Sequence, residues 1–205
     1  MGEIKKQDCV NSLAQILSHT LECDEANAAA LALISRYGNL DAILSFDESR
    51  LCEVGGFGMN SAILLKLVGY VNARSVIEAA ASKENLDAIE LMEYIKALFL
   101  GLTVETVYLI LFDSNGRIIS TEYMGEGTVA ASDVYPRKLL ECAVGKRAHS
   151  VILAHNHPHG SVVPSKDDLA VTKKLESLFM TVGIGFREHY IVADGDISAI
   201  NTSEA

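Results

Sequence analysis

Apolar residues along the first 80 positions recur every three or four residues. Ala and Leu keep this spacing through "SLAQILSHTL", "ANAAALALISRYGNL" and "SAILLKLVGYVNARSVIEAAA", and Gly and Asn stand at the breaks. Such spacing places apolar side chains on one face of a helix, and Gly or Asn commonly follows a helix end. The pattern predicts a small all-α domain over residues 1–80.

A second pattern begins after the polar stretch "ASKE", and it predicts a second domain over residues 84–205 with its own leading helix, "LDAIELMEYIKALFLGL". From residue 104, β-branched and aromatic residues predict a strand in "VETVYLILF" and another in "IISTEYM". The turn "DSNGR" between them suits a hairpin, because Asn and Gly tolerate positive φ.

Helices and strands then alternate to the end of the chain. "PRKLLECAVGKRA" predicts a helix with Pro136 in its first turn, "SVILA" a buried strand, and "SKDDLAVTKKLESLFMTV" a helix with one apolar stripe. "HYIVADG" and "ISAI" predict the last strands. Because hairpins accompany these helices, we expect an α/β (α+β) core with a mixed sheet and flanking helices, not a doubly wound sheet.

Composition and charge narrow the function classes. The 205 residues include 17 Lys and Arg against 27 Asp and Glu, a formal net charge of −10. Affinity for nucleic-acid phosphates depends largely on Lys and Arg, so any nucleic-acid role must depend on local geometry. No apolar run reaches the roughly 20 residues that cross a bilayer, and "MGEIKKQDCV" lacks the apolar region of a signal peptide. We expect a soluble cytoplasmic protein without a membrane partner.

The four cysteines are widely separated, at positions 9, 23, 52 and 142. No Cys-x-x-Cys pair is present that could form a zinc knuckle or a redox couple. The sequence therefore predicts buried free thiols.

The candidate chemistry lies in "LAHNHPHGSVVPSKDD", residues 153–168. His155 and His157 stand two apart at the end of a predicted strand, so both point to one side and Asn156 to the other. Ser165 has the composition of a helix N-cap, and Asp168 follows in the first turn. The two histidines and Asp168 would form a three-ligand site with an open fourth position, typical of a catalytic zinc, one per chain. Singly, the histidines could be a surface accident and Ser165 with Asp168 a capping box without metal.

The pattern H-x-H-P-x-G-x-x-x-P-S-x-x-D closely resembles the metal motif of the JAMM (JAB/MPN) metalloprotease-like proteins. Pro158, Gly160, Pro164 and Ser165 resemble its bacterial RadC branch, as do "YPRKLLECAV", "SVILAHNHP" and "HYIVADGD". In the first domain, "SRYGNLDAILSFDESRLCEVGGFGMNSAILLKL" is similar to the helix-hairpin-helix region of the same family. The resemblance implies a JAB/MPN-like core behind a helix-hairpin-helix domain.

The resemblance also implies a reaction, the hydrolysis of an amide or isopeptide bond in a substrate that the sequence does not identify. Zinc would lower the pKa of a water molecule toward ~7, and Glu105 matches the family's general base. Glu105 shares strand parity with Val107, on an apolar face where an unpaired carboxylate is costly. The alternative is an exposed residue at a frayed strand start. Ser165 would donate a hydrogen bond to the developing oxyanion.

Two further histidines need a role. His159 stands where the RadC-like motif usually has serine, and it is either an exposed loop residue or a fourth ligand that closes the site. His189 is interpreted as a residue that packs near the site or contacts a ligand, because no metal-ligand spacing relates it to the others.

The helix-hairpin-helix candidate is "LCEVGGFGMNSAILLKL". Gly56 and Gly58 would allow a tight turn whose backbone N–H groups face a phosphate, with Lys66 as the nearest cation. The alternative is a packing or partner-docking module. Two function classes therefore stay open: a zinc-dependent JAMM hydrolase, with or without association with DNA, or a RadC-like DNA-repair-associated or docking protein whose metal site is structural or vestigial. The oligomeric state is not predicted.

Overall fold

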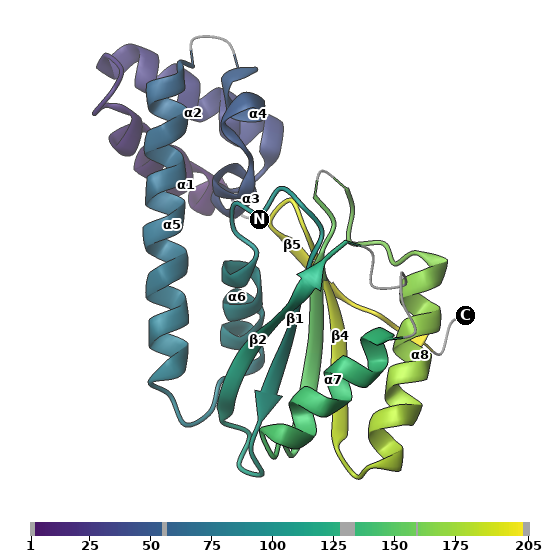
Figure 1. Ribbon diagram of the computed structural model, residues 1–205. Helices are drawn as coiled ribbons and strands as arrows, with labels where there is room; N and C mark the ends of the chain where they lie inside the picture. Colours follow the sequence, from purple (N-terminus) through teal and green to yellow (C-terminus); the bar gives the residue numbers. More distant parts are fainter. Residues whose placement is uncertain (1–2, 55–56, 128–133, 159, 203–205) are drawn as a thin grey trace. The chain divides into compact units, whose positions relative to one another are not determined.

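A computed structural model describes residues 3–54, 57–127, 134–158 and 160–202. The chain divides into two compact units, Met1–Ser75 and Val76–Ala205 (Figure 1). This division lies inside helix α5 (Met59–Ala81), whereas the sequence pattern placed it at the end of that helix. The difference arises because Ala80 packs with the core of the second unit, which helical spacing alone does not reveal.

The first unit is helical, as predicted. It contains α1 (Glu3–Leu17), α2 (Cys23–Tyr37), α3 (Leu40–Ser45), α4 (Glu48–Cys52) and most of α5. Side chains at the N-caps start the two short helices, since Asn39 accepts a hydrogen bond from the Ala42 N–H and Asp47 accepts one from the Arg50 N–H. The apolar stripes meet in one core, which includes Leu13, Leu17, Leu33, Ile34, Ile43, Leu51 and Leu65.

The second unit is built on a mixed sheet of five strands. They are β1 (Thr106–Phe112), β2 (Ile118–Glu126), β3 (Ser150–Asn156), β4 (Gly185–Ala193) and β5 (Asp196–Ala199), in the order β2-β1-β3-β4-β5. Strands β3 and β4 are parallel, and the other neighbouring pairs are antiparallel. The predicted combination of a mixed sheet with flanking helices is confirmed.

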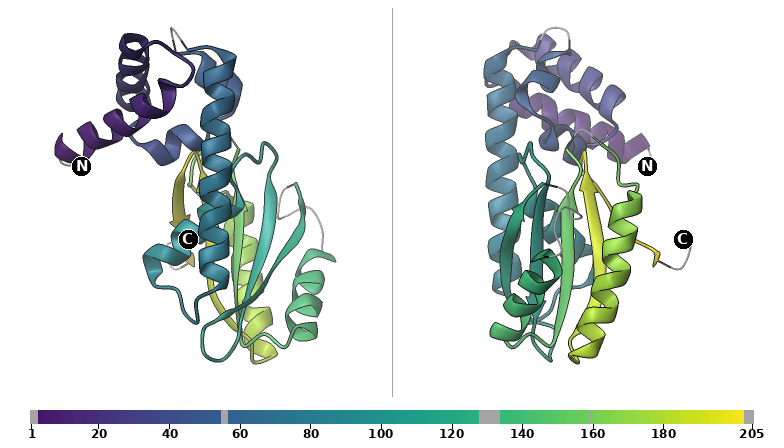
Figure 2. Two further views of the ribbon diagram at one scale, coloured as in Figure 1. Left: turned by 90° about the vertical axis from the view of Figure 1, so that its left-hand side faces the viewer. Right: turned by 45° about the vertical axis from the view of Figure 1, so that its right-hand side comes forward.

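Helices cover both faces of this sheet (Figure 2). Helices α7 (Val134–Gly145) and α8 (Lys166–Thr181) cover the face that carries Val107, Leu109, Val151 and Leu153. Helix α6 (Ala88–Leu98) covers the other face, where the alternate residues point; they include Ile110, Phe112, Ile152 and Ala154. The central strands β1 and β3 are therefore apolar on both sides.

Two details, in the β1–β2 turn and at the cysteines, differ from the sequence-based expectations or refine them. In the β1–β2 turn, positive φ is found at Gly116 but not at Asn115, and the Asp113 side chain accepts hydrogen bonds from the Asn115 and Arg117 N–H groups. The four cysteines are free, but none is fully buried and Cys23 is exposed. Among the described helices, none has the length and apolar character to cross a membrane.

Candidate metal centre

The end of strand β3 carries the two histidines of the predicted site. His155 pairs with Val107 of β1 and Ile191 of β4, so it lies on the face of the sheet that α7 and α8 cover. Its side chain is fully buried. His157 follows the strand, and its N–H still donates to the Val192 carbonyl at 2.9 Å. The His157 side chain is 21% exposed, so the site can be reached from solvent on this side.

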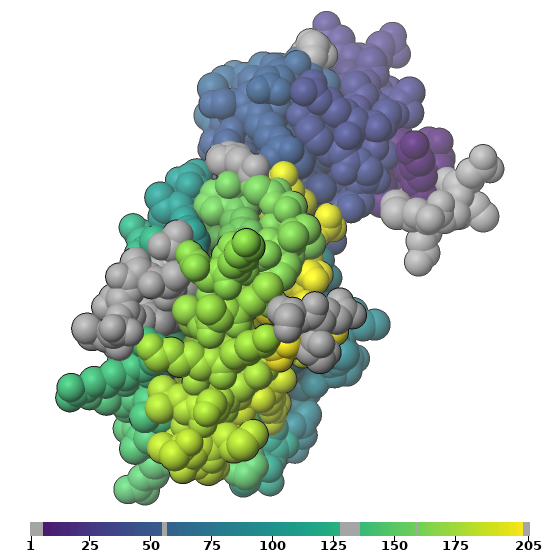
Figure 3. Space-filling view, turned by 90° about the vertical axis from the view of Figure 1, so that its right-hand side faces the viewer, coloured from purple at the N-terminus to yellow at the C-terminus, as the bar shows by residue number. Residues whose placement is uncertain are grey.

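Asp168 lies in the first turn of helix α8, which lies along the surface of the second unit (Figure 3). Ser165 is the N-cap, and its N–H and Oγ donate to Asp168 Oδ2 at 2.8 and 2.7 Å. The Asp168 N–H donates in return to Ser165 Oγ at 3.1 Å. This capping box fixes the carboxylate, which is only 4% exposed.

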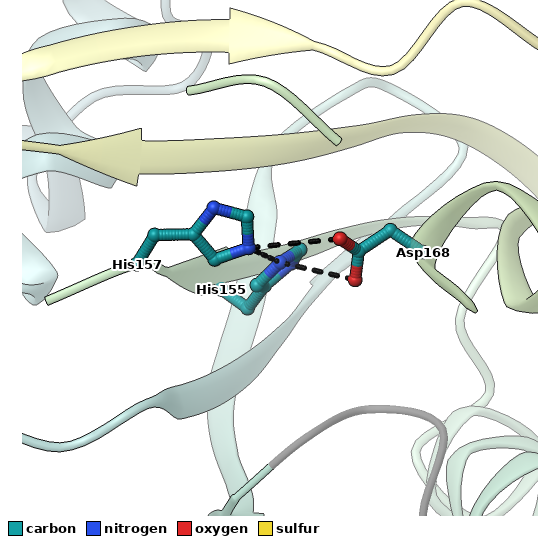
Figure 4. Close-up of side chains that lie close together, drawn as sticks. All are labelled: His155, His157 and Asp168. Carbon is teal, nitrogen blue, oxygen red and sulfur yellow. Dashed lines mark hydrogen bonds and ion pairs between the residues drawn. The ribbon is translucent and has the colours of Figure 1, made fainter. Parts of the chain in front are cut away.

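The three predicted ligands point toward one another (Figure 4). His155 Nε2 lies 2.9 Å from His157 Nε2 and 3.3 Å from Asp168 Oδ1, and His157 Nε2 lies 3.6 Å from Asp168 Oδ2. Ligands of a tetrahedral ion at ~2.0–2.1 Å lie about 3.3 Å apart. The geometry is therefore one that could hold a metal ion.

The protonation of the histidines fits this geometry. His157 Nδ1 lies 2.8 Å from the Ser161 carbonyl, which can only accept, so neutral His157 has its lone pair on Nε2. Burial lowers the pKa of His155 to about 4, against the opposing effect of Asp168, and His155 is therefore neutral at physiological pH. A cation bound between these groups would offset the charge of the buried carboxylate.

The second ring nitrogen of His155 contacts His189, 2.9 Å from His155 Nδ1 to His189 Nε2. His189 is fully buried on β4, and burial lowers its pKa far below the usual value. Its Nδ1 lies 2.7 Å from Thr172 Oγ1. The contact with a ligand ring is one of the two roles predicted for His189. Thr172 was missed, although it stands one helical turn after Asp168 and therefore on the same face of α8.

Asn156, between the histidines, points to the opposite face of the sheet. Its Oδ1 accepts a hydrogen bond from the Thr106 N–H at 2.8 Å, and its Nδ2 donates to the Val104 carbonyl at 3.2 Å. These bonds hold the backbone on both sides of Glu105. Glu105 is half-buried directly before β1, and its carbonyl accepts from the Gly127 N–H at 2.8 Å. Its role as the general base stays a prediction.

The predicted DNA-contacting residues lie in the first unit. Gly58 is exposed at the start of α5, where its carbonyl accepts from the next helical turn. Lys66 is only 5% exposed, and this burial lowers its pKa although Glu48 and Asp47 oppose the shift. A buried ammonium is poorly placed for a phosphate, so the position of Lys66 counts against this prediction. Gly56 lies outside the described residues, as does His159.

Comparison with known proteins agrees with the family resemblance found in the sequence. A family described as RadC-like JAB domain matches residues 86–204. A UPF0758 protein of Aliivibrio fischeri (strain MJ11) is 31% identical over 174 residues, which cover 83% of this chain and 78% of that protein. A UPF0758 protein of Actinobacillus pleuropneumoniae serotype 5b (strain L20) is 33% identical over 165 residues, 80% of this chain and 75% of that protein. The chain therefore belongs to the family of RadC-like JAB-domain proteins.

Proposed function

We propose that this protein is a zinc-dependent hydrolase of amide or isopeptide bonds. The observation that carries the proposal is the convergence of His155 Nε2, His157 Nε2 and the Asp168 carboxylate, whose closest contacts with one another are 2.9, 3.3 and 3.6 Å. Three protein ligands that leave one position open are typical of catalytic zinc, whereas structural zinc has four. The partial exposure of His157 leaves a route for substrate and water.

Zinc, when bound, supplies a Lewis acid that lowers the pKa of a coordinated water toward ~7 and polarises a carbonyl. Glu105 takes the proton of the attacking water and returns it to the leaving amine. The hydrogen bonds from Asn156 to both neighbours of Glu105 keep this segment fixed. Ser165 donates to the developing oxyanion. For that step its hydroxyl must turn from Asp168 Oδ2, while its backbone N–H continues to hold the carboxylate.

Metal content and turnover test the proposal together. Elemental analysis should find about one zinc per chain, and His157→Ala should release it. The matched control is His149→Ala, which removes an exposed histidine outside the site. A panel of fluorogenic amide and isopeptide substrates should be cleaved by the zinc-loaded protein and the control but not by His157→Ala. Two histidines and a carboxylate also suit Fe(II), so iron at full occupancy would contradict the proposal. Full turnover by His157→Ala would contradict it as well.

The alternative is a DNA-associated or partner-docking protein whose metal site is structural or vestigial. The loop between α4 and α5, where Gly56 and Gly58 would face a phosphate, is described only in part. Within the described part of the first unit, the one cation assigned to this contact, Lys66, is buried. We therefore place hydrolysis first and keep DNA association as a separate property of the first unit, to be measured independently.

A further inference from the structure

A chain of hydrogen bonds runs from the candidate metal centre into the core behind it. His155 Nδ1 lies 2.9 Å from His189 Nε2, and His189 Nδ1 lies 2.7 Å from Thr172 Oγ1. Thr172 Oγ1 lies 2.6 Å from the Asp168 carbonyl. His155, His189 and Thr172 are all fully buried or nearly so, and no water is needed to complete the chain.

The last link gives the chain a direction. A hydroxyl has one proton, and a carbonyl oxygen can only accept, so the short contact places the Thr172 proton on the bond to the Asp168 carbonyl. Thr172 Oγ1 then accepts from His189 Nδ1–H. In a neutral imidazole with its proton on Nδ1, the other nitrogen is an acceptor. His189 Nε2 therefore accepts a hydrogen bond from His155 Nδ1–H.

We propose that Thr172 and His189 are positioning residues that fix the Nδ1–H tautomer of His155, so that its Nε2 lone pair faces the metal. This nitrogen is the one that lies 2.9 Å from His157 Nε2 and 3.3 Å from Asp168 Oδ1. If the hydrogen bonds ran the other way, with His189 Nε2–H donating to His155 Nδ1, the proton of neutral His155 would be on Nε2 and would block the ligand atom. We call the hydrogen-bonded series His155–His189–Thr172 the relay. Helix α8 supplies both Asp168 and, one turn later, Thr172, so the helix that carries one ligand also carries the end of the relay.

Substitution of Thr172 separates this role from packing. Thr172→Val keeps the shape of the side chain but leaves the His189 Nδ1–H without its acceptor at a fully buried position. The His189 proton then moves to Nε2 and forces the proton of His155 onto its ligand nitrogen. We expect zinc affinity to fall roughly 10- to 100-fold, the usual effect of removing a group that orients a metal-binding histidine. Thr172→Ser keeps the hydroxyl, loses a methyl group, and should bind zinc nearly as tightly as the wild type.

A packing role alone predicts the opposite order, with valine tolerated and serine the weaker variant. Zinc dissociation constants, measured by competition with a chromophoric chelator, distinguish the two orders. A second pair allows for poor folding of the valine variant: His189→Gln offers an acceptor and a donor and should retain more affinity than His189→Leu.

The inference rests on the metal centre of the proposed function but can fail separately from it. Ring ¹⁵N resonances of metal-free protein report which nitrogen of each histidine is protonated, whether or not any amide is hydrolysed. We expect protons on His155 Nδ1 and His189 Nδ1. A proton on His155 Nε2, or a Thr172→Val protein that binds zinc as tightly as the wild type, would overturn the relay.

Discussion

Replacing Asn156 with leucine should loosen the segment that carries Glu105. The Asn156 side chain accepts from the Thr106 N–H at 2.8 Å and donates to the Val104 carbonyl at 3.2 Å. Val104 is 45% exposed, so water can replace the lost donor, whereas Thr106 is only 2% exposed. The cost therefore falls on the Thr106 N–H, and an unsatisfied buried donor costs about 1–3 kcal/mol.

This cost can be measured at the amide itself. About 2 kcal/mol corresponds to a roughly 30-fold loss of protection of the Thr106 amide against hydrogen exchange, because that free energy no longer opposes local opening. The melting temperature should fall by about 4–8 °C for a chain of this size. Zinc content should stay at the wild-type value, since Asn156 points away from the three proposed ligands. Hydrolysis of amide substrates should become slower, because Glu105 is less firmly positioned.

The matched control is Asn156→Asp. It keeps an acceptor for the Thr106 N–H, but it replaces the donor to the Val104 carbonyl with an oxygen and adds a negative charge at a buried position. Overall stability should therefore fall, while protection of the Thr106 amide relative to neighbouring amides should persist. If the leucine variant protected this amide as well as the wild type and kept full turnover, Asn156 would be a packing residue and the account of the Glu105 segment would be wrong.

Three further substitutions test other assignments. Glu105→Gln should keep the zinc and the fold while turnover drops roughly 10²- to 10⁴-fold; loss of zinc would make Glu105 a ligand, and full turnover would move the base elsewhere. Gly58→Val should leave the fold intact, because a Cβ there meets no heavy atom within 4 Å, and should weaken DNA binding at low salt in anisotropy assays; unchanged affinity would favour a docking module. Lys66→Met should be the more stable protein at neutral pH, because the unfolded chain holds the lysine proton more tightly than the folded one. Wild-type stability therefore rises with pH as the pH passes from the lowered pKa toward 10.5, and parallel urea-unfolding profiles of the two proteins would contradict this reasoning.

The core strands and the ligand group were accessible to sequence reasoning because each depends on local periodicity. The run of apolar residues in β1 is continuous, as expected of a strand buried on both faces. His155 and His157 share a face through the two-residue period of a strand, and Asp168 follows its N-cap at a fixed distance. None of these inferences requires knowledge of which distant strands pair.

The relay behind His155 was not accessible because it depends on pairing between distant segments. Leu153 pairs with His189 in the parallel β3–β4 register, and this register brings His189 beside His155 across 34 positions of sequence. No residue spacing encodes such a contact. Lys66 is a different case, since it stands four residues after the buried Ala62 and next to the buried Leu65. Helical spacing could therefore have placed it on the buried face of α5.

The capping box and the candidate metal centre do not compete as explanations of the Ser165–Asp168 spacing, because the cap hydrogen bonds go to Oδ2 and leave Oδ1 facing His155. Asp168 Oδ2 accepts the Ser165 N–H and Oγ protons, while Oδ1 lies 3.3 Å from His155 Nε2. A carboxylate reaches back to the N-cap backbone N–H when it stands three positions after the cap, as Asp168 does after Ser165. The cap therefore orients the carboxylate before a metal arrives, which reduces the conformational entropy lost on binding. The spacing that starts helix α8 is also the spacing that aims the free oxygen of Asp168 at the histidines.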